Sequence, residues 1–95
     1  MVVPGVVIHL VRLTEDTMIA FSGRSSHLGE RVLWFPDQLY NGYDGVFMEP
    51  CHIERWAIDG TRIFGPAPRN LDRYELWIED GRVMVDTQDL TLGAR

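Results

Sequence analysis

Short apolar runs recur along the chain, separated by Gly, Pro, Asp and Asn at the spacing typical of strands in a β-barrel or β-sandwich. No segment keeps a helical period over ten residues. The pattern therefore predicts an all-β protein. The expected strands cover residues 6–13, 17–21, 31–35, 46–48, 55–58, 62–64, 74–79 and 82–86.

Three turns are expected to join neighbouring strands as hairpins. Residues 14–16 connect the first two strands, and Asp59-Gly60 would form a two-residue turn that places Trp56 opposite Ile63. Asp80-Gly81 predicts a type I′ turn in the last hairpin, with Glu79 opposite Arg82. The same register sets Ile78 opposite Val83 and Leu76 opposite Val85. The expected core face of that hairpin is Tyr74, Leu76, Ile78, Val83 and Val85.

Glycine, proline and polar residues mark the connecting segments. Residues 22–30 predict an exposed loop, Pro36 is expected to end the strand before it, and residues 37–45 read as a turn-rich insertion containing Asn41-Gly42 and Asp44-Gly45. Residues 65–69 contain two prolines and predict a stiff, extended loop. The polar residues 87–95 are expected to fray.

The length and charge limit the function classes. A chain of 95 residues suits one compact domain over 1–95, and its apolar content of 45% favours a folded core. The formal net charge is -5, and all nine basic residues are scattered arginines, so nucleic acid is not an expected partner. His9 and Arg12 interrupt the apolar run at 6–13, so we expect neither a membrane span nor a signal peptide. The expected location is therefore the cytoplasm.

Two isolated reactive side chains have structural interpretations. Cys51 is the only cysteine, which excludes an intramolecular disulfide. It adjoins His52, but adjacent residues in an extended chain point in opposite directions, so we expect a buried, inert thiol and no catalytic activity of the chain on its own. His9 lies within an apolar strand, where a neighbouring carbonyl or solvent at a sheet edge would satisfy its ring.

Two histidine-bearing stretches resemble the cluster-binding loops of Rieske iron–sulfur domains. The family motifs Cys-x-His-Leu-Gly-Cys and Cys-Pro-Cys-His-Gly-Ser fall on residues 25–30 and 49–54, and residues 65–69 and 80–85 resemble its C-terminal half. The resemblance extends from about Val6 to Val85. It implies a Rieske-type antiparallel β-sandwich or small barrel. Loop 1 (near 22–30), loop 2 (near 49–56) and the proline loop (65–69) would converge at its tip.

The resemblance also shows where the cluster ligands are missing. In the family, one cysteine and one histidine from each motif hold the two irons. His27 and His52 match the histidines, whereas Ser25 and Glu49 stand at the cysteine positions. Hydroxyl and carboxylate oxygens are hard ligands with little preference for this cluster, so no ordinary [2Fe–2S] cluster is expected.

Further departures from the family lie at the same tip. Cys51 remains from the family's loop disulfide, and its partner position is Glu30. Glu54 and Trp56 replace the serine and tyrosine that donate hydrogen bonds near the cluster, and Ile53 replaces the glycine after the second histidine.

Three functions follow from this resemblance. The first is a redox-silent structural or interaction domain of an oxidoreductase or electron-transfer assembly, with a redox-complex subunit as protein partner and compatible with a homo-oligomer. The second is a mononuclear zinc or iron site formed by His27, Glu49 and His52, with Ser25 or water completing the shell. The third is a Rieske [2Fe–2S] electron-transfer protein with unusual ligands.

Overall fold

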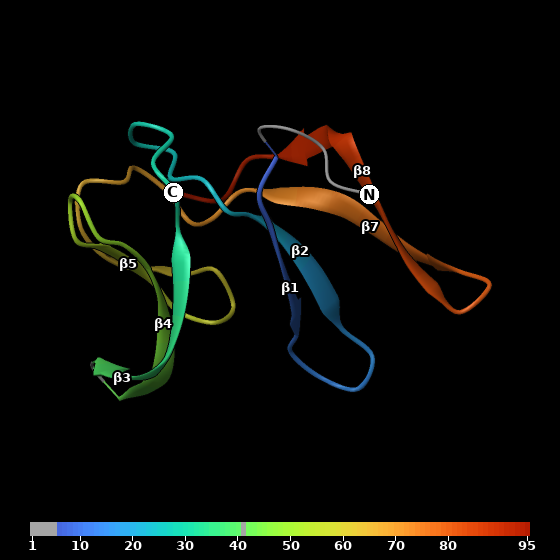
Figure 1. Cartoon of the computed structure of the whole chain (residues 1–95), viewed down its shortest axis with the longest axis horizontal. Coiled ribbons are helices and arrows are strands. Elements are labelled where there is room, and N and C mark those ends of the chain that lie inside the picture. The colour runs from blue at the N-terminus through green and yellow to red at the C-terminus, as the bar shows by residue number, and fades with distance from the viewer. Residues whose placement is uncertain (1–5, 41) are drawn as a thin grey trace.

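The chain forms two antiparallel four-stranded sheets in a computed structural model that describes residues 6–40 and 42–95 (Figure 1). One sheet has the order β1-β2-β7-β8 and the other the order β3-β4-β5-β6. The strands are β1 (Ile8–Arg12), β2 (Met18–Ser22), β3 (Leu33–Tyr40), β4 (Tyr43–Glu49), β5 (Glu54–Trp56), β6 (Arg62–Phe64), β7 (Arg73–Glu79) and β8 (Arg82–Thr91). The predicted all-β class is confirmed. Within the described ranges there is no helix that could cross a membrane.

The first hairpin follows the predicted pattern. β1 pairs with β2 from Ile8↔Ser22 to Arg12↔Met18, and the turn closes with the Leu13 N–H donating to the Thr17 carbonyl at 2.9 Å. Alternation along β1 directs Val11 into the core, where it is 8% exposed, while Leu10 is 54% exposed. The period-two pattern of this segment was therefore sufficient to place its strands.

The predicted insertion at 37–45 is wrong, because most of that segment is strand. β3 continues through Pro36 to Tyr40, and the β3–β4 register shifts between Phe35 and Leu39. Pro36 is tolerated because β3 is an edge strand and the irregularity removes the need for its missing N–H. The Asn41-Gly42 turn falls partly outside the described residues. Asp44-Gly45 lies inside β4 and is no turn.

The predicted two-residue turn at Asp59-Gly60 is also wrong. Residues 57–61 form the connection, with the Ala57 N–H donating to the Thr61 carbonyl, and Trp56 pairs with Arg62 instead of Ile63. Gly60 has a φ of 86°, and a Cβ there would lie 2.5 Å from the ring of Phe21. Because this loop packs closely against Phe21 of the other sheet, a longer connection forms in place of the two-residue turn.

The last hairpin has the predicted register but not the predicted burial. Glu79 pairs with Arg82 and Ile78 with Val83, and both turn residues have positive φ, as a type I′ turn requires. Ile78 is nevertheless 59% exposed and Val83 37% exposed. Tyr74, Leu76 and Val85, nearer the base, are only partly buried, because no other sheet covers the outer part of the hairpin (Figure 1).

The C-terminal segment is ordered, so the prediction that it frays is wrong. β8 extends to Thr91, the Gly93 N–H donates to the Asp72 carboxylate at 2.9 Å, and the Asn70 N–H donates to the Ala94 carbonyl at 2.8 Å. Arg69 holds the same Asp72 carboxylate through two hydrogen bonds of 2.8 and 3.0 Å. Tertiary hydrogen bonds therefore fix a segment whose polar composition suggested mobility.

The core lies between the two sheets. It combines side chains from β1 and β2 with others from the second sheet and from the segment before β7, and its buried members are Val11, Phe21, Val32, Phe47, Trp56, Ala67 and Leu71. Phe21 and Phe47 meet edge to face with ring centroids 6.0 Å apart. This contact joins β2 to β4 and fixes how the loops of the two sheets approach each other.

Candidate functional site

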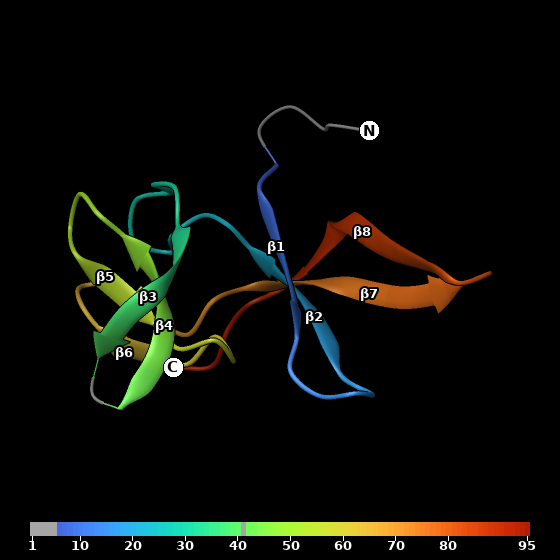
Figure 2. The same ribbon diagram turned by 60° about the horizontal axis from the view of Figure 1, so that its bottom comes forward.

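Loops 1 and 2 meet at one end of the second sheet, as predicted (Figure 2). Loop 1 leads from β2 to β3, and loop 2 is the short connection between β4 and β5. The rings of His27 and His52 lie edge to face, with centroids 5.1 Å apart. The two residues that match the family histidines are therefore neighbours in space although 25 positions separate them.

The buried Glu49 side chain accepts hydrogen bonds from the backbone of loop 2. This side chain is 1% exposed, and its carboxylate accepts hydrogen bonds from the backbone N–H of Cys51 at 2.7 Å and of His52 at 2.8 Å. The same carboxylate lies 3.0 Å from Nδ1 of the His52 ring. Burial by itself raises the pKa of Glu49. The two backbone donors and then the His52 ring outweigh that effect, so the pKa is lowered from its ordinary value.

Glu54 connects loop 1 to loop 2. Its side chain is fully buried, and it accepts a short hydrogen bond from the Ser25 hydroxyl. Its other carboxylate oxygen lies 3.5 Å from Nδ1 of His27, and both of these buried atoms lack a hydrogen-bond partner. The Ser25 hydroxyl also accepts the backbone N–H of His27 at 3.0 Å, so one serine orders the histidine loop and ties it to β5.

The proline loop packs directly behind this arrangement. Gly65 has a φ of 109°, and a Cβ at that position would lie 2.7 Å from the Cα of Glu54. Glycine is required there because of this close approach. Ala67 is 2% exposed and joins the core, while the Trp56 indole N–H donates to the Arg69 carbonyl at 3.2 Å. The proline loop thus packs against the residues of the tip.

The predicted ligand set divides into two separate pairs. His52 lies with Glu49, whereas His27 lies with Glu54, and the Ser25 hydroxyl donates to Glu54. Glu49 and Glu54 are opposite each other in the β4–β5 ladder. Sequence reasoning missed the role of Glu54. A hairpin drawn through residues 49–54 would have found it, because that hairpin sets the two carboxylates on one rung.

Ile53 adopts a backbone conformation that normally favours glycine. Its φ is 58°, and its side chain is 48% exposed. A β-branched residue in this left-handed region costs on the order of 1–2 kcal/mol. The hydrogen bonds that Glu49 accepts from the backbone N–H groups of Cys51 and His52, in the same loop, offset this cost.

Cys51 is exposed, so the prediction of a buried thiol is wrong. Its sulfur lies with carboxylate oxygens of Glu30 and Glu49 in a group whose atoms are all within 4.8 Å of one another. Glu30 thus stands beside Cys51, where the resemblance places the other half of a disulfide. The negative charge of Glu30, followed by the hydrogen bond to Glu49, raises the pKa of the Cys51 thiol and disfavours the reactive thiolate.

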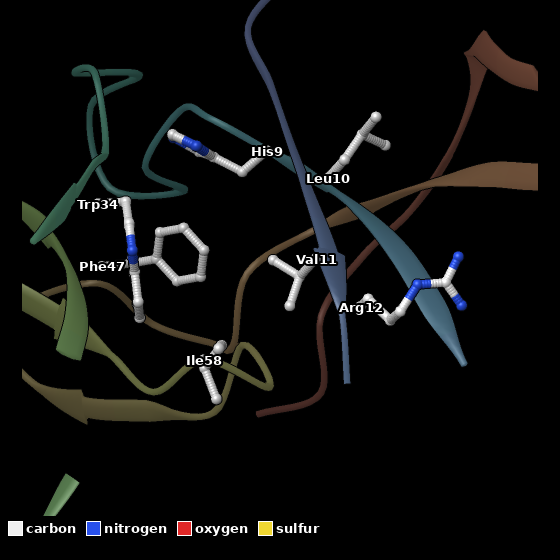
Figure 3. Close-up of a pocket in the computed structure, with 7 residues that line it drawn as sticks. All are labelled: His9, Leu10, Val11, Arg12, Trp34, Phe47 and Ile58. Atoms are coloured by element: carbon white, nitrogen blue, oxygen red, sulfur yellow. The ribbon is translucent and has the colours of Figure 1, made fainter. Parts of the chain in front are cut away.

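A groove of about 260 Å³ lies between the sheets, away from the predicted site residues (Figure 3). His9 and Val11 point from β1 toward the second sheet, while Leu10 and Arg12 point away from it. The His9 ring lies 2.8 Å from the Val32 carbonyl and packs on Phe47 at 5.0 Å. The prediction that a neighbouring carbonyl satisfies His9 is confirmed.

Comparison with known proteins finds a similarity to an iron–sulfur protein, the kind of protein that the two histidine-bearing loops also resemble. The chain is 35% identical over 69 residues to the cytochrome b6-f complex iron-sulfur subunit of Chlorobaculum tepidum. The match covers 73% of this chain and 35% of that subunit, so the chain corresponds to about a third of the relative's length. No family model and no solved structure matches the chain. The similarity supports a Rieske-like chain, in agreement with the two histidine motifs.

The lowered pKa of Glu49 predicts a pH-dependent loss of stability in Glu49→Gln. A carboxylate whose folded pKa lies below its ordinary value of 4.5 stabilises the fold above that value, and the effect disappears as the pH falls through the folded pKa. Urea unfolding should show a loss on the order of 1.5–3 kcal/mol at neutral pH. The difference from wild type should shrink in acid. Glu15→Gln, an exposed control, should change stability little at either pH; a pH-independent effect of Glu49→Gln contradicts the assignment.

The charge of Glu30 predicts slow alkylation of Cys51. Because Glu30 is the largest cause of the raised thiol pKa, Glu30→Gln should increase the thiolate fraction and accelerate reaction with iodoacetamide several-fold at mildly alkaline pH. Mass spectrometry of timed samples measures the rate. Glu15→Gln carries the same charge change far from the thiol and should leave the rate unaltered. Equal rates in all three proteins would contradict the role of Glu30.

Proposed function

We propose that this chain is a redox-silent structural or interaction domain of an electron-transfer assembly. The observation that carries the proposal is the use of Glu49, at a position where the cluster needs a thiolate, as an internal hydrogen-bond acceptor for loop 2. Ser25, at the other thiolate position, donates to buried Glu54. Both positions thus serve the stability of the tip.

The side chains present do not fit an ordinary [2Fe–2S] cluster. Such a cluster needs two soft thiolate ligands beside the two histidines, whereas Ser25 and Glu49 offer only hard oxygen donors. Both oxygens already accept or donate hydrogen bonds inside the fold. Binding a cluster would require breaking those bonds and leaving Glu54 buried without its donor, which is costly for a carboxylate.

Association with a redox complex is supported by the similarity to a subunit of one. The relative is named as the iron-sulfur subunit of the cytochrome b6-f complex, and in this chain His27 and His52 meet at a tip with the proline loop packed behind Glu54. Internal hydrogen bonds hold this tip in a fixed shape without a cluster, and a fixed surface of this kind is suited to docking on a partner protein. Copurification with a defined redox-complex subunit tests the association, and recovery of the chain alone from its native host contradicts it.

Anaerobic assembly with iron and sulfide tests the redox-silent part of the proposal. The wild-type chain should gain neither stoichiometric inorganic sulfide nor a Rieske-type visible spectrum, while a Rieske protein treated in parallel gains both. The double variant Ser25→Cys/Glu49→Cys restores the two thiolate positions and is the matched comparison. One cluster per wild-type chain would reject the proposal in favour of a Rieske electron carrier with unusual ligands.

A second candidate function is the binding of a single zinc or iron ion by His27, Glu49 and His52. Two observations favour it: the rings of His27 and His52 lie with centroids 5.1 Å apart, and Nδ1 of His27 is buried without a hydrogen-bond partner. Imidazole and carboxylate are ligands common to zinc and non-haem iron sites. Ser25 or water would complete the coordination shell of the ion. Binding would require His27 and His52 to turn away from Glu54 and Glu49, their present partners, toward the ion.

Thermal unfolding with added Zn²⁺ tests the metal candidate. An ion that binds only the folded state at a concentration of about 100 times its Kd stabilises by about 2.7 kcal/mol, which raises the Tm measurably. His27→Ala should abolish the increase, and Cys51→Ser should preserve it. An increase that survives His27→Ala but disappears in Cys51→Ser would place the ion at Glu30, Glu49 and Cys51 instead, and no increase in wild type rejects the candidate.

A further inference from the structure

The outer part of the β7–β8 hairpin, residues 75–86, forms an arm that projects from the sheet (Figure 2). β2 pairs with β7 only at Ala20↔Tyr74 and Phe21↔Arg73, so the arm has only two strands. A two-stranded hairpin without further cover is marginally stable in water. A second surface packed against the arm would therefore stabilise it.

The arm exposes apolar side chains on both faces. Trp77 is 40% exposed, Ile78 59%, Val83 37% and Met84 36%. β8 is also the outermost strand of its sheet and runs for ten residues, so its outer edge presents backbone groups that no described strand pairs with. A long apolar edge of this kind is a template for pairing with another strand.

The residues along this edge are complementary to themselves in the antiparallel direction. Residues 82–86 read Arg, Val, Met, Val, Asp, so reversing the segment exchanges a positive for a negative end and leaves the apolar centre unchanged. We propose that β8 pairs with β8 of a second copy of this chain, with Met84 opposite Met84. The inference is independent of the loop tip and goes beyond the proposed function.

The hydrogen-bond pattern of the hairpin suits this register. In a hairpin closed by a two-residue turn, Glu79 and Arg82 exchange backbone hydrogen bonds, so along β8 the groups of Arg82, Met84 and Asp86 face β7. The N–H and C=O of Val83 and Val85 then face outward. Pairing about Met84 sets Val83 opposite Val85 of the second copy, and these outward groups exchange bonds on both sides of the two-fold axis.

The charges favour the same register. Arg82 would lie opposite Asp86 of the second copy, in the closely spaced type of pair that brings side chains together. Among the described residues Arg82 forms no ion pair, and Asp86 lies opposite Glu75, a second carboxylate. Like charges directly opposite each other are unfavourable in a ladder, and the arginine of the second copy would offset them.

Sedimentation equilibrium over a range of concentrations measures the predicted dimer of the 10.9 kDa chain. Arg82→Asp and Asp86→Arg each place like charges together in a homodimer, and each should weaken dimerisation about tenfold or more. An equimolar mixture of the two variants places opposite charges together at both positions and should restore the affinity. This rescue distinguishes antiparallel pairing from any other contact of the arm.

A backbone variant tests the edge itself. Val85→Pro removes an N–H that faces outward and so spares the bonds to β7, and it should give a monomer with an unchanged circular dichroism spectrum. Val85→Ile keeps the N–H and should remain dimeric. A wild-type chain that stays monomeric up to about 1 mM, or a dimer that none of these substitutions weakens, overturns the proposal. Either result would favour a different protein as the partner of the arm.

Discussion

The burial of Phe21, Phe47 and Trp56 between the two sheets is the contact on which the rest of the structure depends. Each side chain is at most 2% exposed. Full burial of a large apolar side chain contributes about 1.5–3 kcal/mol, so the loss of any one of them would remove a large part of the net stability of about 5–15 kcal/mol typical of a domain. Gly60 and the proline loop lie where they do because they pack against this centre.

The position of the candidate site follows from that packing. β4 and β5 carry Phe47 and Trp56 opposite each other, and two rungs further along the same pair of strands ends in Glu49 and Glu54. Two carboxylates buried on one rung would repel each other without compensating groups. Backbone N–H groups, a serine and two histidines supply that compensation. The resulting network holds together the loops in which the family motif would place a cluster.

Internal hydrogen bonds fix the form of the tip, where several residues differ from the motifs of the family that the chain resembles. Ile53 keeps a glycine-like φ of 58°, and Cys51 remains beside Glu30, where the resemblance places its disulfide partner. Internal hydrogen bonds to Glu49 and Glu54 tie the loops together in this structure. The rings of His27 and His52 are adjacent, and each histidine contacts a different buried carboxylate.

Local patterns were sufficient for the elements whose stability is local. Period-two alternation placed the first hairpin, and Asp80-Gly81 determined the register of the last one, because a type I′ turn permits only one closing pair. The resemblance to Rieske domains correctly indicated that the two histidine-bearing loops converge. Turn dipeptides failed at Asp44-Gly45 and Asp59-Gly60, where packing of Gly45 near Trp34 and of Gly60 near Phe21 overrides the local preference.

The sequence by itself therefore determined the all-β class, most strand positions and the residues that gather at the tip. Only the tertiary structure decided which carboxylate each histidine contacts, that Cys51 is exposed, and that the apolar arm at 75–86 lies outside the core. The reason is physical. Strand periodicity shows which side chains share a face, but whether that face meets a second sheet, a buried charge or solvent depends on contacts between segments far apart in the chain.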